Sequence, residues 1–234
     1  MAKRLTRKKL KQKDEFITTA EKLLNAARKR KSYLVIAGIV VFFLLIFGSI
    51  GFYYYKDYLR RGSIQYSQAL QLYELASRTH DKNDITNALN AFETLITNFR
   101  FLNISKLAML YAGSCEYMLG NYDKAIQDYR TFISKWGDKN VYILSIAYNG
   151  IIQADIAKND CNSALNVITD LLKQKDNPFV ELTYVHGVDC YIKMNNPKKA
   201  IEFLDTAIKN NSNNKDLVSQ LTNILNYVKE NYTR

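Results

Sequence analysis

The sequence predicts an all-α protein in which one transmembrane helix precedes an α-solenoid of about four divergent helical hairpins and a C-terminal capping helix. Three observations predict this class. Glycine and proline together make up only 11 of the 234 residues, too few for the tight turns of a β-sandwich or barrel. A long uncharged segment follows a basic tail. A helical hydrophobic pattern then recurs four times, and with an apolar fraction of 47% it excludes a disordered chain.

Positive charge is concentrated at the N-terminus. Residues 1–31 carry 12 Lys and Arg against three acidic residues, whereas residues 32–234 carry 21 against 19. The formal net charge of +11 therefore belongs mainly to a tail, and the remainder is nearly neutral. A protein that binds nucleic acid usually has its basic patch on the domain that reads it. The charge distribution therefore disfavours a nucleic-acid partner.

The segment 32–55 contains no charged residue. As an α-helix of about 1.5 Å per residue it would be roughly 36 Å long, enough to cross a hydrocarbon core of about 30 Å. Tyr53, Tyr54 and Tyr55 end it with rings of the kind found at membrane interfaces. A cleavable signal peptide has a shorter apolar region, of about 7–15 residues, and a lipoprotein would have a cysteine just after the segment. We therefore expect an uncleaved transmembrane helix.

The distribution of Lys and Arg around this segment predicts its orientation. Twelve precede it, and only Lys56, Arg60 and Arg61 follow it closely. Because positively charged flanks stay in the cytoplasm, the N-terminus is expected inside and residues 56–234 outside. In a bacterium this describes a single-pass protein of the inner, or cytoplasmic, membrane with its C-terminal domain in the periplasm.

Four regions are therefore expected along the chain. They are a basic cytosolic tail at 1–31, the transmembrane helix at 32–55, a linker at 56–66 and a repeat domain at 67–234. Within the tail, Asp14–Arg30 has apolar residues on one helical face and basic residues on the other. Two interpretations of this amphipathic helix remain open. It binds lipid or a membrane protein, or it serves only to fix the topology.

The recurring pattern is anchored on an alanine. A large apolar residue follows each alanine by four positions and an apolar pair follows by seven and eight, which traces one face of a helix. The four alanines are Ala88, Ala125, Ala164 and Ala200. Turn and N-cap residues precede each alanine by five and four positions, namely Asn83-Asp84, Gly120-Asn121, Asn159-Asp160 and Asn195-Asn196. Each unit is therefore predicted to be a helix, a tight turn and a second helix that begins near the alanine.

The sequence also predicts where the first helix of each unit lies. The expected ranges are Gln68–Arg78, Lys106–Leu119, Leu144–Ala157 and Glu181–Met194. At the point where the two helices pack, Ala76 and Gly113 supply small residues in the first two units, whereas Ile152 and Val188 hold the corresponding positions later. A final amphipathic stretch, Lys215–Tyr232, is expected to cap the stack.

These residues resemble a known repeat family. The run Leu119–Ile126 with Tyr129 resembles a tetratricopeptide repeat, and Met194–Leu204 is a second good match. The resemblance covers about 165 residues in four units. The spacings between alanines are 37, 39 and 36 where the family has about 34, and its closing proline is absent from all four units. The resemblance implies a stack of hairpins that binds proteins and leaves its curvature open.

The whole layout resembles a narrower family, the ancillary subunit of the bacterial Sec translocon. That resemblance implies a periplasm-facing scaffold that links protein export to periplasmic chaperones, with Sec components, chaperones or exported chains as partners. The section Phe92–Trp136 also resembles repeats of the envelope protein that coordinates cell division with outer-membrane constriction. An adaptor in envelope assembly or cell division is therefore the alternative.

We expect no enzymatic activity, cofactor, metal or small-molecule substrate. The glycines form neither GxGxxG nor GxxxxGK, and neither HExxH nor a nucleophile elbow occurs. His80 and His186 belong to different units and are expected to be surface or packing residues.

The three cysteines leave at least one thiol unpaired in an oxidising compartment. Cys115 and Cys190 occupy equivalent sites in their first helices and are expected to be buried packing residues. A bond between them is improbable because repeats two apart rarely touch. Cys161 falls in a turn and is the reactive candidate if it is exposed.

Tetratricopeptide stacks bind partners along a concave face lined by their first helices. By register, this face is expected to include Tyr73, Leu110, Ser114, Tyr117, Asn149, Gln153, Val185 and Asp189. Such a mixture of aromatic, apolar and amide groups suits extended or helical peptide segments. It lacks the Lys and Arg that would clamp a C-terminal carboxylate, so recognition of acidic tails is disfavoured.

Overall fold

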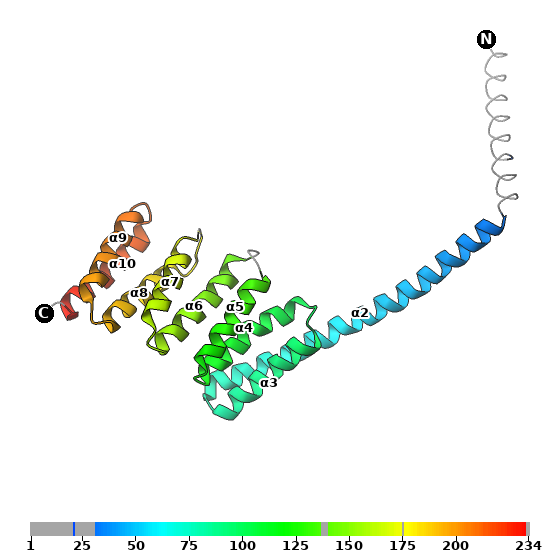
Figure 1. The fold of residues 1–234 in the computed structure, drawn as a ribbon, viewed down its shortest axis with the longest axis horizontal. Helices are drawn as coiled ribbons and strands as arrows, with labels where there is room; N and C mark the ends of the chain where they lie inside the picture. Colours follow the sequence, from blue (N-terminus) through cyan, green and yellow to red (C-terminus); the bar gives the residue numbers. More distant parts are fainter. Residues whose placement is uncertain (1–20, 22–30, 137–139, 175, 233–234) are drawn as a thin grey trace, which may run out of the picture. The chain divides into compact units, whose positions relative to one another are not determined.

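The computed structural model describes residues 21, 31–136, 140–174 and 176–232 (Figure 1). Within these residues the protein is all-α, with nine helices and no strand, which confirms the predicted fold class. The amphipathic helix expected at Asp14–Arg30 lies, apart from Glu21, outside the described residues.

The helices pair into hairpins along the chain. The first members of the pairs are α2 (Lys31–Thr79), α4 (Asn103–Met118), α6 (Val141–Ala157) and α8 (Val180–Lys193). The second members are α3 (Lys82–Asn98), α5 (Tyr122–Trp136), α7 (Cys161–Leu172) and α9 (Pro197–Asn210), and α10 (Lys215–Tyr232) follows them. From α3 to α10 each helix contacts the next, and α4 also contacts α6 and α6 contacts α8 (Figure 1). The first helices therefore form one layer, and α10 covers α8 and α9 at its end.

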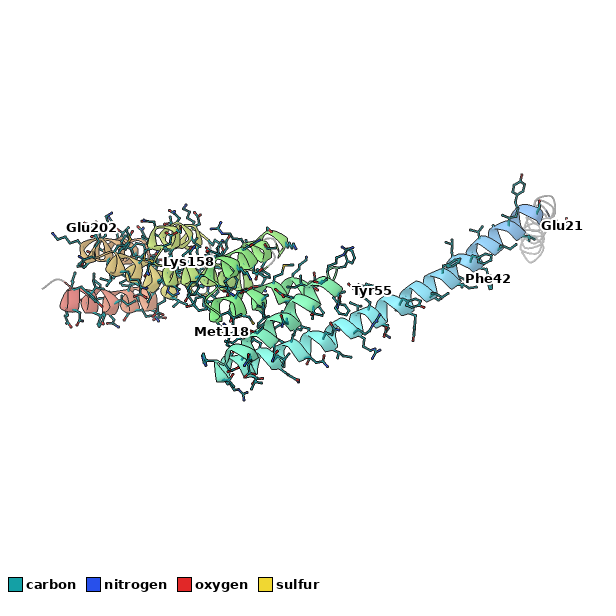
Figure 2. All side chains as sticks on the ribbon, turned by 60° about the horizontal axis from the view of Figure 1, so that its bottom comes forward. Glu21, Phe42, Tyr55, Met118, Lys158 and Glu202 are labelled. Carbon is teal, nitrogen blue, oxygen red and sulfur yellow. The ribbon has the colours of Figure 1, made fainter. Side chains whose placement is uncertain are left out.

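The chain divides into two units, Met1–Tyr58 and Leu59–Arg234, with the boundary inside α2. In the first unit, α2 is long and apolar enough to cross a membrane, and none of its most apolar stretch is buried. Side chains between Phe42 and Tyr55 project from this helix, and no other part of the described chain covers them (Figure 2). By length and composition it is a candidate for a single membrane span. Residues 56–66, expected as a linker, are helical and lie within α2.

In the second unit, the turn inside each hairpin uses one residue with a left-handed backbone. These residues are His80, Gly120, Asn159 and Asn195, with φ between 54° and 79°. In the last three turns the same three backbone hydrogen bonds recur, from N–H groups to carbonyls four, three and five positions earlier. The bonds satisfy the carbonyls that a helix end leaves free. Glycine and asparagine tolerate this conformation best, which explains their place five residues before the alanine.

The first turn differs from the prediction. We expected Asn83-Asp84 to form the turn and cap, but α3 begins at Lys82 and its N-cap is Asp81. The Asp81 carboxylate accepts hydrogen bonds from the N–H groups of Asn83 and Asp84, at 2.8 and 3.2 Å. A carboxylate at this place satisfies two backbone N–H donors and interacts favourably with the positive end of the helix dipole. The helix therefore starts earlier relative to its alanine than in the other hairpins.

The alanine register describes the core correctly. All four anchoring alanines are fully buried, and the residues four positions later, Phe92, Tyr129, Ile168 and Leu204, are at most 6% exposed. Close packing in the later hairpins depends on glycines that the register did not single out. A Cβ on Gly150 would lie 2.5 Å from Cε2 of Tyr129, and one on Gly187 would lie 2.6 Å from Cε1 of Phe203. Glycine at these sites lets an aromatic ring pack directly on the backbone of the first helix.

The contact between Gly150 and Tyr129 provides a test of this packing. Gly113 of α4 approaches the same ring, where an added Cβ would lie 3.0 Å from Cε1, so the ring cannot easily move away. We expect Gly150→Ala to lower the free energy of unfolding by about 1–2 kcal/mol, because the clash outweighs the gain in helix propensity. Urea titration of the full-length protein in detergent micelles, followed by circular dichroism, measures this. The penalty should shrink in a Tyr129→Leu background, and an equal penalty in both backgrounds would exclude the clash as its cause.

Candidate partner-binding surface

Three of the predicted surface residues meet in one groove. Ser114 of α4 and Asn149 and Gln153 of α6 line a cavity of about 240 Å³. The other lining residues are Tyr129, Ile146, Gly150, Phe179 and Leu182. We call this the middle groove. Ile146, Asn149, Gly150 and Gln153 recur at spacings of three and four and so lie on one face of α6.

The middle groove has an apolar wall. Ile146 and Leu182 are 36% and 38% exposed, and Phe179, the N-cap residue of α8, is half-buried beside them. The Phe179 ring is held by the ring of Tyr142, with centroids 5.3 Å apart. Exposed apolar side chains that converge on a cavity are typical of a binding site.

The side-chain amide of Asn149, at the same groove, has a hydrogen-bond partner for its nitrogen but none for its oxygen within the described residues. Asn149 is only 5% exposed. Its Nδ2 donates to the backbone oxygen of Ser145 at 2.8 Å, whereas Oδ1 makes no hydrogen bond within the described residues. A buried acceptor left unsatisfied costs about 1–3 kcal/mol. Asn149 Oδ1 is itself buried, so an enclosed water rather than a segment lying in the groove would satisfy it.

Tyr73 and Ser114 connect the first hairpin to this groove. The Tyr73 hydroxyl lies 2.8 Å from Ser114 Oγ, although the two residues are 41 positions apart. The Tyr73 ring packs edge-on against Tyr111, at 5.1 Å between centroids. Burial is the main cause that raises the pKa of Tyr129 above its usual value, and the nearby Ser114 hydroxyl acts in the opposite direction. These contacts fix the orientation of the polar groups beside the groove.

The other predicted residues lie elsewhere. Leu110 is 9% exposed and belongs to a core cluster with Tyr129 and Phe132. Tyr117 is half-buried, and its ring lies 5.5 Å from that of Tyr122. The structure therefore places both in the packing between helices.

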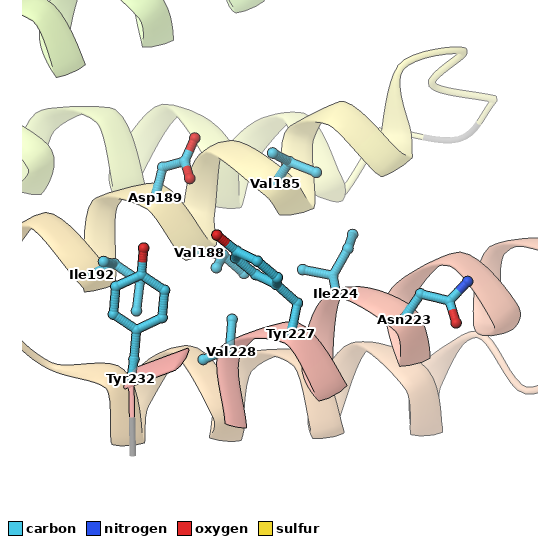
Figure 3. A pocket seen from close by; sticks show the side chains of 9 residues that line it. All are labelled: Val185, Val188, Asp189, Ile192, Asn223, Ile224, Tyr227, Val228 and Tyr232. Atoms are coloured by element: carbon cyan, nitrogen blue, oxygen red, sulfur yellow. The ribbon is translucent and has the colours of Figure 1, made fainter. Parts of the chain in front are cut away.

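Val185 and Asp189 line a second groove, between α8 and α10, with a cavity volume of about 340 Å³. We call it the C-terminal groove. Figure 3 shows Tyr227 and Tyr232 of α10 facing Val188 and Ile192 of α8 across it. Sequence reasoning missed the contribution of α10, which it treated as a cap alone. The apolar, half-exposed face of α10 was the signal that could have revealed it.

The cysteines and histidines do not form a third site. Cys115, Cys161 and Cys190 are all buried free thiols, so the exposure that would make Cys161 a reactive surface thiol is not present. His80 is exposed, and His186 is half-buried, with its pKa lowered mainly by burial. In the described part of the chain, no group of three or more His, Cys, Asp or Glu residues is placed to hold a metal ion.

Two acidic residues, Glu116 of α4 and Asp128 of α5, influence each other in the second hairpin. Glu116 is 4% exposed, accepts a hydrogen bond from Asn121 Nδ2 at 2.6 Å and lies 3.5 Å from Lys124 Nζ. Burial, followed by the charges of Glu116 and Glu93, raises the pKa of Asp128 on α5 to about 6. Asp128 therefore keeps its proton to a higher pH in the folded protein than a free Asp does.

Comparison with known families gives one clear match. A family model described as a tetratricopeptide repeat-like domain matches residues 29–226. The match includes the apolar part of α2 as well as the hairpins. Among curated proteins, none matches this chain.

The raised pKa of Asp128 predicts a pH-dependent stability. Because the folded state holds this proton up to about pH 6, whereas an unfolded Asp loses it near pH 4, the free energy of unfolding should fall as pH rises from about 4 to 6. Asp128→Asn should reduce this slope in urea titrations of the full-length protein. Asp205→Asn, at an exposed site on α9, is the control and should keep the slope. An unchanged slope in Asp128→Asn would assign the pH dependence to other groups.

Proposed function

The chain belongs to the tetratricopeptide repeat-like domain family, and on that premise we propose that it is a membrane-anchored scaffold for partner proteins. Domains of this family mediate protein–protein interactions. The observation that carries the proposal is the middle groove, where the apolar side chains of Ile146 and Leu182 lie beside the polar side chains of Ser114 and Gln153.

The chemistry of the middle groove suits an extended, uncharged segment of a partner protein. An apolar side chain of such a segment would cover Ile146 and Leu182. Ser114 and Gln153 would provide the polar contacts to its backbone. None of the described residues that line the groove is charged, which favours apolar segments over acidic tails.

In this proposal α2 anchors the scaffold. Residues 32–55 span the bacterial inner membrane, the basic tail stays in the cytoplasm and residues 67–234 stand in the periplasm. The excess of Lys and Arg before the span supports this orientation. Anchoring raises the effective concentration of the groove near membrane partners without any new contact.

For the biological role, we favour an ancillary subunit of the Sec translocon that links export to periplasmic chaperones. The order of tail, span and repeats supports it, together with a family match that begins before the span and continues through the repeats. A chain that emerges from a channel is unfolded and exposes apolar segments, which are the kind of ligand the middle groove suits. An adaptor in envelope assembly or cell division shares the same architecture and is distinguished by its partners.

Photo-crosslinking in living cells tests the role. A photoreactive residue at Ile146, in the middle groove, should give adducts with Sec subunits, exported chains or periplasmic chaperones. The control position is Gln127, which is exposed on α5 outside the groove and should give fewer adducts. Division or cell-wall proteins at position 146 would favour the alternative role, and cytosolic adducts would overturn the orientation. Equal yields at both positions would exclude the groove as the binding surface.

A charge on the apolar wall tests the groove itself. Leu182 is 38% exposed, so Leu182→Asp should leave thermal unfolding nearly unchanged. We expect it to reduce the adduct yield from position 146 by about tenfold, which corresponds to about 1.4 kcal/mol of binding free energy. Met194→Asp is the matched control, because Met194 is 43% exposed at the other end of α8 and lies outside the groove. Full capture by a folded Leu182→Asp protein would contradict the assignment.

A further inference from the structure

Two of the three cysteines lie against each other in the core. Cys161 and Cys190 belong to one buried cluster together with Ile152, Ala164 and Ile168. Cys161 is close enough to Cys190 to help raise the pKa of the Cys190 thiol. They are 5% and 0% exposed, respectively.

The arrangement of helices explains this contact. Cys161 is the first residue of α7, and Cys190 lies in the last turn of α8. Helices α7 and α8 contact each other and are joined by a short connection, so the start of α7 faces the end of α8. A bond between the two thiols would therefore join the second helix of the third hairpin to the first helix of the fourth.

We propose that Cys161 and Cys190 form a disulfide that fastens the third hairpin to the fourth. Cys115 provides an internal comparison. It occupies in α4 the site that Cys190 occupies in α8, and it is equally buried. In α3, however, the helix that precedes α4, the position three residues before the anchoring alanine, which Cys161 holds in α7, is Ile85, so no second thiol is available beside Cys115 in the equivalent place.

The bond forms by exchange with an oxidant that is itself a disulfide, such as a dithiol–disulfide oxidoreductase or oxidised glutathione. The Cys161 thiolate attacks one sulfur of the oxidant, which gives a mixed disulfide and releases one thiolate. The Cys190 thiolate then attacks Cys161 Sγ, which forms the Sγ–Sγ bond and releases the second thiolate. The cysteines lose two protons and two electrons, and the oxidant becomes two thiols.

Burial sets the conditions for this exchange. Burial, with smaller effects from Cys161, raises the pKa of Cys190 well above its usual value, so its thiolate is scarce while α8 is packed. The exchange therefore takes place during folding or when the end of the stack opens. Once formed, the bond is shielded from reductants by the same packing.

The presence of this bond in the cell rests on the proposed function, because it requires that residues 59–234 stand outside the reducing cytosol. Formation of the bond by the purified protein does not depend on that function. Bond formation in the cell and in the purified protein can each be measured on the full-length chain, so a failure of the disulfide is distinguished from a failure of the proposed location.

The first experiment uses full-length protein in detergent micelles with oxidised glutathione. We expect a mass loss of about 2 Da, one thiol remaining after denaturation, and a melting temperature about 5–10 °C higher than in dithiothreitol, because the bond closes a loop of about 30 residues. Cys161→Ala and Cys190→Ala should lose this redox dependence, whereas Cys115→Ala should keep it. The comparison of oxidised with reduced protein within each variant cancels the cost of the substitution. Three thiols after oxidation, or a redox effect that survives in Cys161→Ala, would overturn the inference.

The second experiment traps thiols in membranes of cells that express the full-length protein. Maleimide–polyethylene glycol added under denaturing conditions should modify one cysteine before reduction and three after it. If the purified protein forms the bond but all three thiols are free in the cell, the disulfide geometry holds and the proposed periplasmic location is wrong.

Discussion

The stack depends on the packing of one aromatic ring between the backbones of two first helices. Tyr129 of α5 lies against Gly113 of α4 and Gly150 of α6, at distances that leave no room for a Cβ on Gly150. The ring is 6% exposed, so it both fills the core and closes one side of the middle groove. Ser114, beside it, is held by the Tyr73 hydroxyl. The position of the groove therefore follows from how closely α4 and α6 approach this ring.

Local chemistry explains why much of this fold can be predicted from sequence. The turn before each second helix needs a residue that tolerates positive φ, and Gly120, Asn159 and Asn195 meet that need within a few residues of the anchoring alanine. The capping helix was predicted with the same bounds that α10 has, because its apolar period is uninterrupted. The first turn was missed because α3 begins six residues before its alanine and is capped by Asp81, not by Asn83-Asp84. The residue with positive φ there is His80, which is neither Gly nor Asn and lies outside the register of the other three turns.

The candidate surface was less predictable because its walls come from several elements. Register alone placed Ser114, Asn149 and Gln153 on neighbouring first helices, and they do share a groove. Register could not show that Leu110 turns into the core, or that Phe179, in the connection before α8, packs against Tyr142. The contact between Cys161 and Cys190 is similar. It depends on the angle at which the fourth hairpin follows the third, which the sequence pattern does not specify.

The charged tail and the uncharged middle groove lie in different parts of the chain, and this affects how a partner would reach the groove. The net positive charge is concentrated in residues 1–31, whereas the residues that line the middle groove are uncharged. The lining itself therefore supplies no long-range attraction, and the apolar wall acts only at contact. A small groove of this kind binds weakly by itself. An anchor that confines the groove to the membrane surface offsets this weakness by raising the local concentration. Weak capture near a membrane partner also allows rapid release, which a scaffold that passes segments onward requires.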